Sequence, residues 1–196
     1  MSLSDIQLHA DKSWTLFLDR DGVLNVETPG TYVTSWEEFV FCDGVLDALR
    51  SLNDIFGRIV IVTNQRGVGR GIMPLEALLT INHNMVAAIS AAGGRIDKIY
   101  ACTAVSDDDH NRKPNTGMAT QAKEDFSEID FRRSVMVGNS MSDMEFGKKL
   151  SMHTVFLTTK HAPYLLPHDF IDEQYDSLPS WSKTLKRAEI GGAVPL

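Results

Sequence analysis

Cysteine is scarce in this sequence. Its 196 residues contain only two cysteines, Cys42 and Cys102. Two are too few for a disulfide framework, and neither has a Cys or His neighbour at the close spacing typical of zinc sites. We therefore expect two buried thiols.

Long apolar runs and positive charge are also lacking. No apolar run approaches the ~18–20 residues of a membrane span, and residues 1–5 lack the basic and apolar regions of a secretion signal. Lys and Arg number 19 against 26 Asp and Glu, a formal net charge of -7. Proteins that bind nucleic acid or anionic membranes through bulk charge carry the opposite sign. We expect a soluble, cytoplasmic monomer or weak dimer without nucleic-acid or membrane partners.

The composition is otherwise that of an ordinary globular domain. Hydrophobic residues make up 43% and charged residues 23% of the chain, a mixture too apolar to remain disordered. The length fits one domain of ~100–200 residues. We predict a single domain over residues 1–196, with a core over about 14–160 and a C-terminal extension over 161–196.

Short apolar runs alternate along the chain with longer stretches of helical periodicity. This alternation is typical of βαβ units and predicts an α/β fold with a mostly parallel central sheet flanked by helices. The predicted strands are 14–18, 59–62, 99–102, 135–137 and 154–157. The predicted helices are 45–56, 74–92, 116–126 and 142–150, with irregular chain after 160 and a last helical turn over 181–187.

Unusual polar residues follow the predicted strands. Because the carboxyl ends of parallel strands share one edge of a sheet, we expect these side chains to converge there. They are Asp19 and Asp21 after the first strand, Thr63 at the second, Lys113 after the third, and Asn139 and Asp143 after the fourth.

This set of side chains suits phosphoryl transfer. Carboxylate and amide oxygens are the ligands that Mg²⁺ prefers. One aspartate could attack phosphorus while a second protonates the leaving oxygen. Thr63 and Lys113 would hold the equatorial oxygens, on which charge develops in the transition state.

Four ordered motifs carry a family resemblance. Residues 18–25, 63–71, 112–114, and 137–139 with Asp143 resemble the motifs of haloacid-dehalogenase-superfamily phosphatases. The resemblance spans about 16–159 and is strongest to the branch that contains D-glycero-D-manno-heptose 1,7-bisphosphate phosphatase and histidinol-phosphate phosphatase. It implies a Rossmann-like fold without a large cap domain.

The resemblance also implies roles for individual residues. Asp19 matches the nucleophile and Asp21 the general acid/base, and Lys113 matches the lysine that stabilises the phosphorylated aspartate. Asp19, the backbone carbonyl of Asp21, Asn139 and Asp143 would form the Mg²⁺ site.

The remaining matched positions are substrate contacts. Thr63 and Asn64 correspond to phosphate-binding positions, and Arg112 to a substrate contact. The expected substrate is a small phosphorylated metabolite, with heptose bisphosphate preferred and histidinol phosphate second. Three alternatives remain: a polynucleotide 3′-phosphatase-like enzyme, a non-catalytic relative, and a signalling receiver domain.

Two departures from the branch bear on metal and substrate. The branch usually carries a Cys/His zinc loop before Arg112, but only Cys102 remains here, so we expect no structural zinc. Asn139 stands where an aspartate ligand is usual, which predicts weaker Mg²⁺ binding; alternatively, Asn139 only caps the following turn. Residues 107–109 read as a solvated charge run rather than a second metal site.

Overall fold

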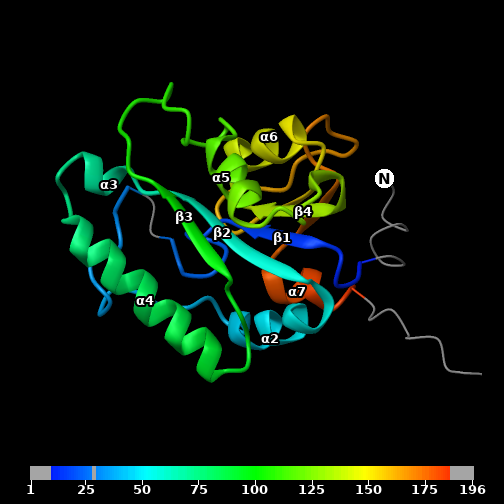
Figure 1. Cartoon of the computed structure of the whole chain (residues 1–196), viewed down its shortest axis with the longest axis horizontal. Coiled ribbons are helices and arrows are strands. Elements are labelled where there is room, and N and C mark those ends of the chain that lie inside the picture. Colours follow the sequence, from blue (N-terminus) through cyan, green and yellow to red (C-terminus); the bar gives the residue numbers. More distant parts are fainter. Residues whose placement is uncertain (1–9, 28–29, 186–196) are drawn as a thin grey trace, which may run out of the picture.

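A six-stranded parallel sheet forms the centre of the molecule (Figure 1). The structure, a computed structural model, describes residues 10–27 and 30–185, and within them the strands lie in the order β3-β2-β1-β4-β5-β6. The predicted α/β fold with a parallel sheet is therefore confirmed. The strands are β1 (Thr15–Leu18), β2 (Arg58–Asn64), β3 (Lys98–Cys102), β4 (Ser134–Gly138), β5 (His153–Leu157) and β6 (Glu173–Tyr175).

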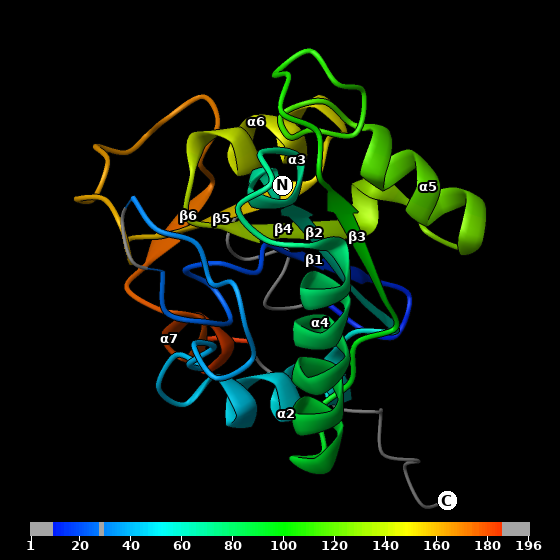
Figure 2. The ribbon, with the colours of Figure 1, turned by 90° about the vertical axis from the view of Figure 1, so that its left-hand side faces the viewer.

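Helices cover both faces of the sheet, as Figure 2 shows. A hydrophobic core lies on each face of the sheet. Alternate residues of β1 pack into these two cores, because successive side chains of a strand point to opposite faces. Phe17 packs in the core beneath α5 and α6, whereas Leu16 and Leu18 pack in the core with α2, α4 and α7. The helices are α2 (Val45–Ile55), α3 (Arg66–Gly69), α4 (Leu75–Ala91), α5 (Gly117–Asp125), α6 (Met141–Lys149) and α7 (Leu178–Ser182).

The chain after residue 160 is more regular than the sequence predicts. β6 pairs with β5 and extends the sheet, and α7 begins at Leu178, earlier than predicted. The Ser177 hydroxyl accepts a hydrogen bond from the backbone N–H of Ser180, which is the N-cap interaction that starts a helix there. Trp181 of α7 is fully buried. Residues 186–187 of the predicted last turn lie outside the described residues.

The stretches after β1 and β2 leave the carboxyl edge of the sheet open. Within the described residues, the chain between β1 and α2 forms loops, and only α3 and α4 lie between β2 and β3. Tyr32 of the first loop packs so closely on α3 that a Cβ on Gly67 would lie 2.9 Å from its ring. Among residues 10–27 and 30–185, no separate cap domain covers this edge, in agreement with the sequence prediction. Among the described helices, none combines the length and apolarity needed to cross a membrane.

Candidate active site

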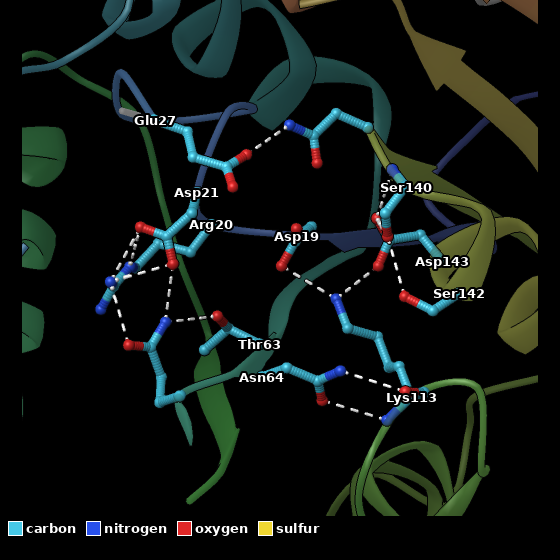
Figure 3. Close-up of polar contacts among 12 residues, drawn as sticks. Asp19, Arg20, Asp21, Glu27, Thr63, Asn64, Lys113, Ser140, Ser142 and Asp143 are labelled. Carbon is cyan, nitrogen blue, oxygen red and sulfur yellow. Dashed lines mark hydrogen bonds and ion pairs between the residues drawn. The ribbon is translucent and has the colours of Figure 1, made fainter. Parts of the chain in front are cut away.

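Three residues from distant parts of the sequence meet at the carboxyl edge of the sheet (Figure 3). Lys113 Nζ lies 2.8 Å from Asp19 Oδ1 and 2.6 Å from Asp143 Oδ1. Asp19 directly follows β1, Lys113 lies in the loop after β3, and Asp143 is in the first turn of α6. All three side chains are buried. The structure thus brings together residues that the sequence placed at separate strand ends.

Burial and neighbouring charges shift the pKa values of Asp19 and Lys113. Desolvation raises the pKa of Asp19 to about 7, Lys113 acts in the opposite direction, and the charges of Asp143 and Asp21 add to the rise. Burial alone would lower the pKa of Lys113, but the two neighbouring carboxylates hold it above its usual value. One ammonium group between two carboxylates leaves an excess of negative charge, which favours binding of a cation.

The start of α6 fixes Asp143. Its Oδ2 accepts hydrogen bonds from the Ser140 backbone N–H at 3.0 Å and the Ser140 hydroxyl at 2.7 Å, within a capping box. This arrangement leaves Oδ1 for Lys113. A Cβ on Gly138 would lie 2.3 Å from the Asp143 Cβ, so the close approach of β4 and α6 requires glycine there.

Asn139 does not cap α6. The N-cap of this helix is Ser140, and the Asn139 Nδ2 donates instead to Glu27 Oε2 at 3.0 Å. The alternative that Asn139 only caps the following turn is therefore wrong. Asn139 is 2% exposed and lies on the wall of the same pocket as Asp19.

Asp21 is held by three neighbours that the sequence did not single out. Arg20 Nη2 donates to its Oδ1 at 2.9 Å, Asn25 Nδ2 donates to Oδ1 at 3.0 Å, and Gln65 Nε2 donates to Oδ2 at 2.8 Å. Burial opposes ionisation of Asp21, but the Arg20 charge and these hydrogen bonds outweigh it and lower its pKa.

The two aspartates after β1 therefore differ in surroundings and orientation. In Figure 3, the Asp21 carboxylate is turned toward Arg20, whereas the Asp19 carboxylate faces Lys113. An ionised Asp21 only accepts hydrogen bonds. To act as a general acid, the Asp21 carboxylate must first lose one of these hydrogen bonds and bind a proton.

Thr63 and Asn64, at the end of β2, hydrogen-bond to other residues of the site. The Thr63 hydroxyl oxygen accepts a hydrogen bond from Gln65 Nε2 at 2.8 Å, which leaves the hydroxyl proton for another acceptor. Asn64 donates to the Lys113 carbonyl at 3.1 Å and accepts from the Lys113 backbone N–H at 3.0 Å. Asn64 therefore holds the backbone that carries the buried lysine.

Basic side chains line the pocket, which has a volume of about 440 Å³. Arg66, Arg70, Arg112 and Lys160 line it, and the Arg70 guanidinium donates to the Tyr32 hydroxyl at 3.1 Å. These cations lie around a centre of carboxylates, an arrangement that suits an anionic substrate together with a bound cation.

Asp107 and Asp108 of the acidic run at 107–109 are exposed, as the sequence predicts. Asp107 is exposed, but it pairs with Arg66 and with Arg112, whose Nε lies 3.0 Å from Asp107 Oδ1. Asp109 accepts hydrogen bonds from the Cys102 thiol at 3.5 Å and the Asn111 backbone N–H at 2.9 Å. Ion pairs and hydrogen bonds therefore fasten the loop that bears Arg112.

The oxygen donors in the pocket fit a magnesium ion. Carboxylates and an amide oxygen are hard ligands of the kind that Mg²⁺ binds, often with several waters retained. Over residues 10–27 and 30–185, no three His, Cys, Asp or Glu side chains are grouped as a metal cluster. The ligands that the sequence predicts are Asp19, a backbone carbonyl at Asp21, the Asn139 amide oxygen and Asp143. Both Asp143 oxygens have partners in this structure, Oδ1 the Lys113 ammonium group and Oδ2 Ser140.

The fold and the pocket together define a class. A parallel sheet of this order, with a buried aspartate after its central strand β1 facing a lysine, identifies a haloacid-dehalogenase-superfamily phosphatase. The chain belongs to the polynucleotide kinase 3 phosphatase family, whose model matches residues 16–170.

Curated relatives support this membership. A D-glycero-alpha-D-manno-heptose-1,7-bisphosphate 7-phosphatase from Campylobacter jejuni is 34% identical over 149 residues, covering 76% of this chain and 84% of the relative. A D-glycero-beta-D-manno-heptose-1,7-bisphosphate 7-phosphatase from Haemophilus influenzae is 36% identical over 154 residues, covering 74% and 82%.

A solved structure is similar over nearly its whole length. The D,D-heptose 1,7-bisphosphate phosphatase from B. bronchiseptica, complexed with magnesium and phosphate, superimposes with a TM-score of 0.78 at 25% identity. The match covers 88% of this chain and 97% of that one. The predicted resemblance to this branch is confirmed.

Proposed function

We propose that this protein is a Mg²⁺-dependent phosphomonoesterase that acts on D-glycero-D-manno-heptose 1,7-bisphosphate and releases the 7-phosphate. The observation that carries the proposal is the buried Asp19 carboxylate, 2.8 Å from Lys113 Nζ in an open pocket lined by basic side chains. The names of the curated relatives supply the substrate.

Asp19 is the nucleophile in the proposed reaction. Its carboxylate oxygen forms a bond to phosphorus as the bond from phosphorus to the sugar oxygen breaks, and that oxygen takes a proton from Asp21. Water, deprotonated by Asp21, then attacks the aspartyl phosphate and releases inorganic phosphate. Lys113 and the Thr63 hydroxyl hold the equatorial oxygens of the phosphoryl group.

The cation site completes this chemistry. Bound Mg²⁺ would neutralise charge on the phosphoryl oxygens, so that the Asp19 carboxylate can approach them. Asp19, the Asp21 carbonyl and Asn139 would hold the ion. Asp143 fixes Lys113 and adds negative charge to the site.

The basic side chains of the pocket support a substrate with a second phosphate. Arg66, Arg70 and Arg112 line the same pocket as Lys113, and a bisphosphate presents a second anion at a distance from the reacting one. The net charge of -7 argues against a polynucleotide as the usual substrate.

Phosphate release should depend on both substrate and magnesium. We expect the highest kcat/KM with heptose 1,7-bisphosphate, a lower value with histidinol phosphate, and little release from a 3′-phosphorylated oligonucleotide. EDTA should abolish release, and excess Mg²⁺ should restore it. Inorganic phosphate is measured across this panel, with the Asp19→Asn protein purified in parallel as a control for contaminating phosphatases. Preferred cleavage of histidinol phosphate or the oligonucleotide would overturn the substrate proposal.

Purified protein should carry no stoichiometric zinc. Cys102 hydrogen-bonds to Asp109 in the segment where a zinc loop would lie, and Arg66 and Arg112 fasten the same segment through Asp107. Elemental analysis of protein expressed with added zinc tests this expectation. About one tightly bound zinc per chain that survives dialysis would contradict it.

A further inference from the structure

The orientation of the Asn139 amide is set by a residue outside the four motifs. Asn139 Nδ2 lies 3.0 Å from Glu27 Oε2. An ionised carboxylate only accepts hydrogen bonds, so the amide nitrogen must face Glu27 and the amide oxygen must point the other way. Asn139 and Glu27 both line the pocket that holds Asp19.

Glu27 is itself held from its other side. Lys160 Nζ lies 2.6 Å from Glu27 Oε1, so the carboxylate bridges an ammonium group and an amide with one oxygen for each. Glu27 follows β1, Asn139 follows β4 and Lys160 follows β5. The loops after three neighbouring strands therefore meet at the Glu27 carboxylate, beside the expected cation site.

Close packing leaves the amide little freedom on this side. Gly22 has a φ of 77°, and a Cβ there would lie 1.9 Å from Asn139 Nδ2, so only glycine permits the observed approach. The Thr159 hydroxyl donates to the Gly22 carbonyl at 2.7 Å and ties the same turn to the chain next to Lys160. The close packing of the Gly22 turn therefore helps to hold Asn139 in contact with Glu27.

We propose that Glu27, held by Lys160, is a positioning residue that directs the Asn139 amide oxygen toward the cation site. The inference rests on the proposed function, because it requires that the pocket binds Mg²⁺. Outer partners of metal ligands orient those ligands and change metal affinity, commonly by 10–100-fold when they are removed.

Swapping the carboxylate and the amide between positions 27 and 139 tests whether Glu27 positions Asn139 or only forms an ion pair with Lys160. Glu27→Gln removes the charge and the firm acceptor, so Mg²⁺ affinity should fall ~10-fold. Asn139→Asp alone places a new carboxylate next to Glu27, and repulsion between them should cancel most of the gain from a charged ligand. In the double variant, the glutamine amide can donate to the new carboxylate, which restores a hydrogen-bonded pair with its polarity reversed. Its affinity should exceed that of either single variant.

Direct binding without substrate is the appropriate readout. Mg²⁺ is titrated by calorimetry into metal-free wild-type protein, the two single variants and the double variant, and thermal unfolding in EDTA confirms that each is folded. Glu128→Gln is the matched control, because Glu128, like Glu27, pairs with a basic side chain, here Arg58, but does not line the pocket. This control should bind Mg²⁺ like the wild type.

A second route leaves the Glu27 and Asn139 side chains unchanged. Lys160→Met removes the group that fixes Glu27, and at high ionic strength salt screens the effect of the lost positive charge on the cation site. Under that condition Mg²⁺ affinity should fall by a smaller factor, ~3-fold, below the range for direct partners of a ligand. This variant keeps the inference testable if Glu27→Gln does not fold.

The outcomes separate the two claims. Unchanged Mg²⁺ affinity in both Glu27→Gln and Lys160→Met, or strictly additive effects in the double variant, would overturn the assignment of Glu27 and leave the proposed function standing. Absence of saturable Mg²⁺ binding by the wild-type protein would overturn both. Non-additive affinities with a tight double variant would support the positioning role.

Discussion

Replacement of Asp19 with asparagine is expected to lower turnover at least ~10³-fold, in line with losses at residues of covalent catalysis. The amide keeps the shape of the side chain but has no nucleophilic oxygen to form the acyl phosphate. The loss should appear in kcat, measured as inorganic phosphate release under saturating Mg²⁺. Lys113 Nζ, now 2.8 Å from a carboxylate oxygen, can still donate to the amide oxygen, so the variant should remain folded.

A matched comparison isolates the chemical role of Asp19. Asp107→Asn also removes one carboxylate near the pocket, but from an exposed position outside the trio of Asp19, Lys113 and Asp143. It should lower kcat far less than Asp19→Asn. Near-normal turnover of the Asp19 variant, with contaminating phosphatase excluded, would mean that another group is the nucleophile.

Lys113→Met is expected to reduce both stability and turnover. The lysine is 3% exposed and faces two carboxylates, so its removal leaves buried negative charge without a neighbouring cation. Breaking a buried ion pair from one side costs about 3–5 kcal/mol. We expect the free energy of unfolding in EDTA to fall by about that amount, and turnover to fall at least ~10²-fold, because an equatorial contact to the phosphoryl group is also lost.

Magnesium should partly compensate for the missing ammonium group. A divalent ion near Asp19 can offset the unpaired carboxylates, so Mg²⁺ should raise the stability of Lys113→Met more than that of the wild type. Urea denaturation with and without Mg²⁺ measures both effects. An unfolding free energy in EDTA equal to that of the wild type would contradict the view that Lys113 neutralises this site.

The sheet was predictable from sequence where its strands are apolar on both faces. Residues 59–62 are β-branched and continuous, as expected for a central strand buried on both sides, and they are fully buried in β2. β6 carries no such signal, because Glu173–Tyr175 contains two polar residues. Its glutamate is buried because His153 Nε2 lies 2.9 Å from one carboxylate oxygen and the Tyr175 hydroxyl donates to the other at 2.8 Å. These partners become visible only after the strands are paired.

The active site was predictable only in part, from the rule that the carboxyl ends of parallel strands share one edge of the sheet. Asp19, Lys113 and Asp143 follow strands or begin a helix at one edge, so their meeting was expected from topology alone. Arg20, Gln65 and Glu27 were missed, because their partners depend on how the loops fold back. A single signal was present for Arg20: an arginine between two aspartates directly after a buried strand has little room to reach solvent, and it is 1% exposed.

The loop that carries Arg112 is held partly by exposed ion pairs. Asp107 contacts Arg66 and Arg112 from an exposed position, and dissolved salt weakens ion pairs of this kind. A loop held by zinc thiolates would resist salt but open to chelators and to oxidants that convert thiolates to higher oxidation states. We therefore expect the ion pairs of this loop to weaken as ionic strength rises.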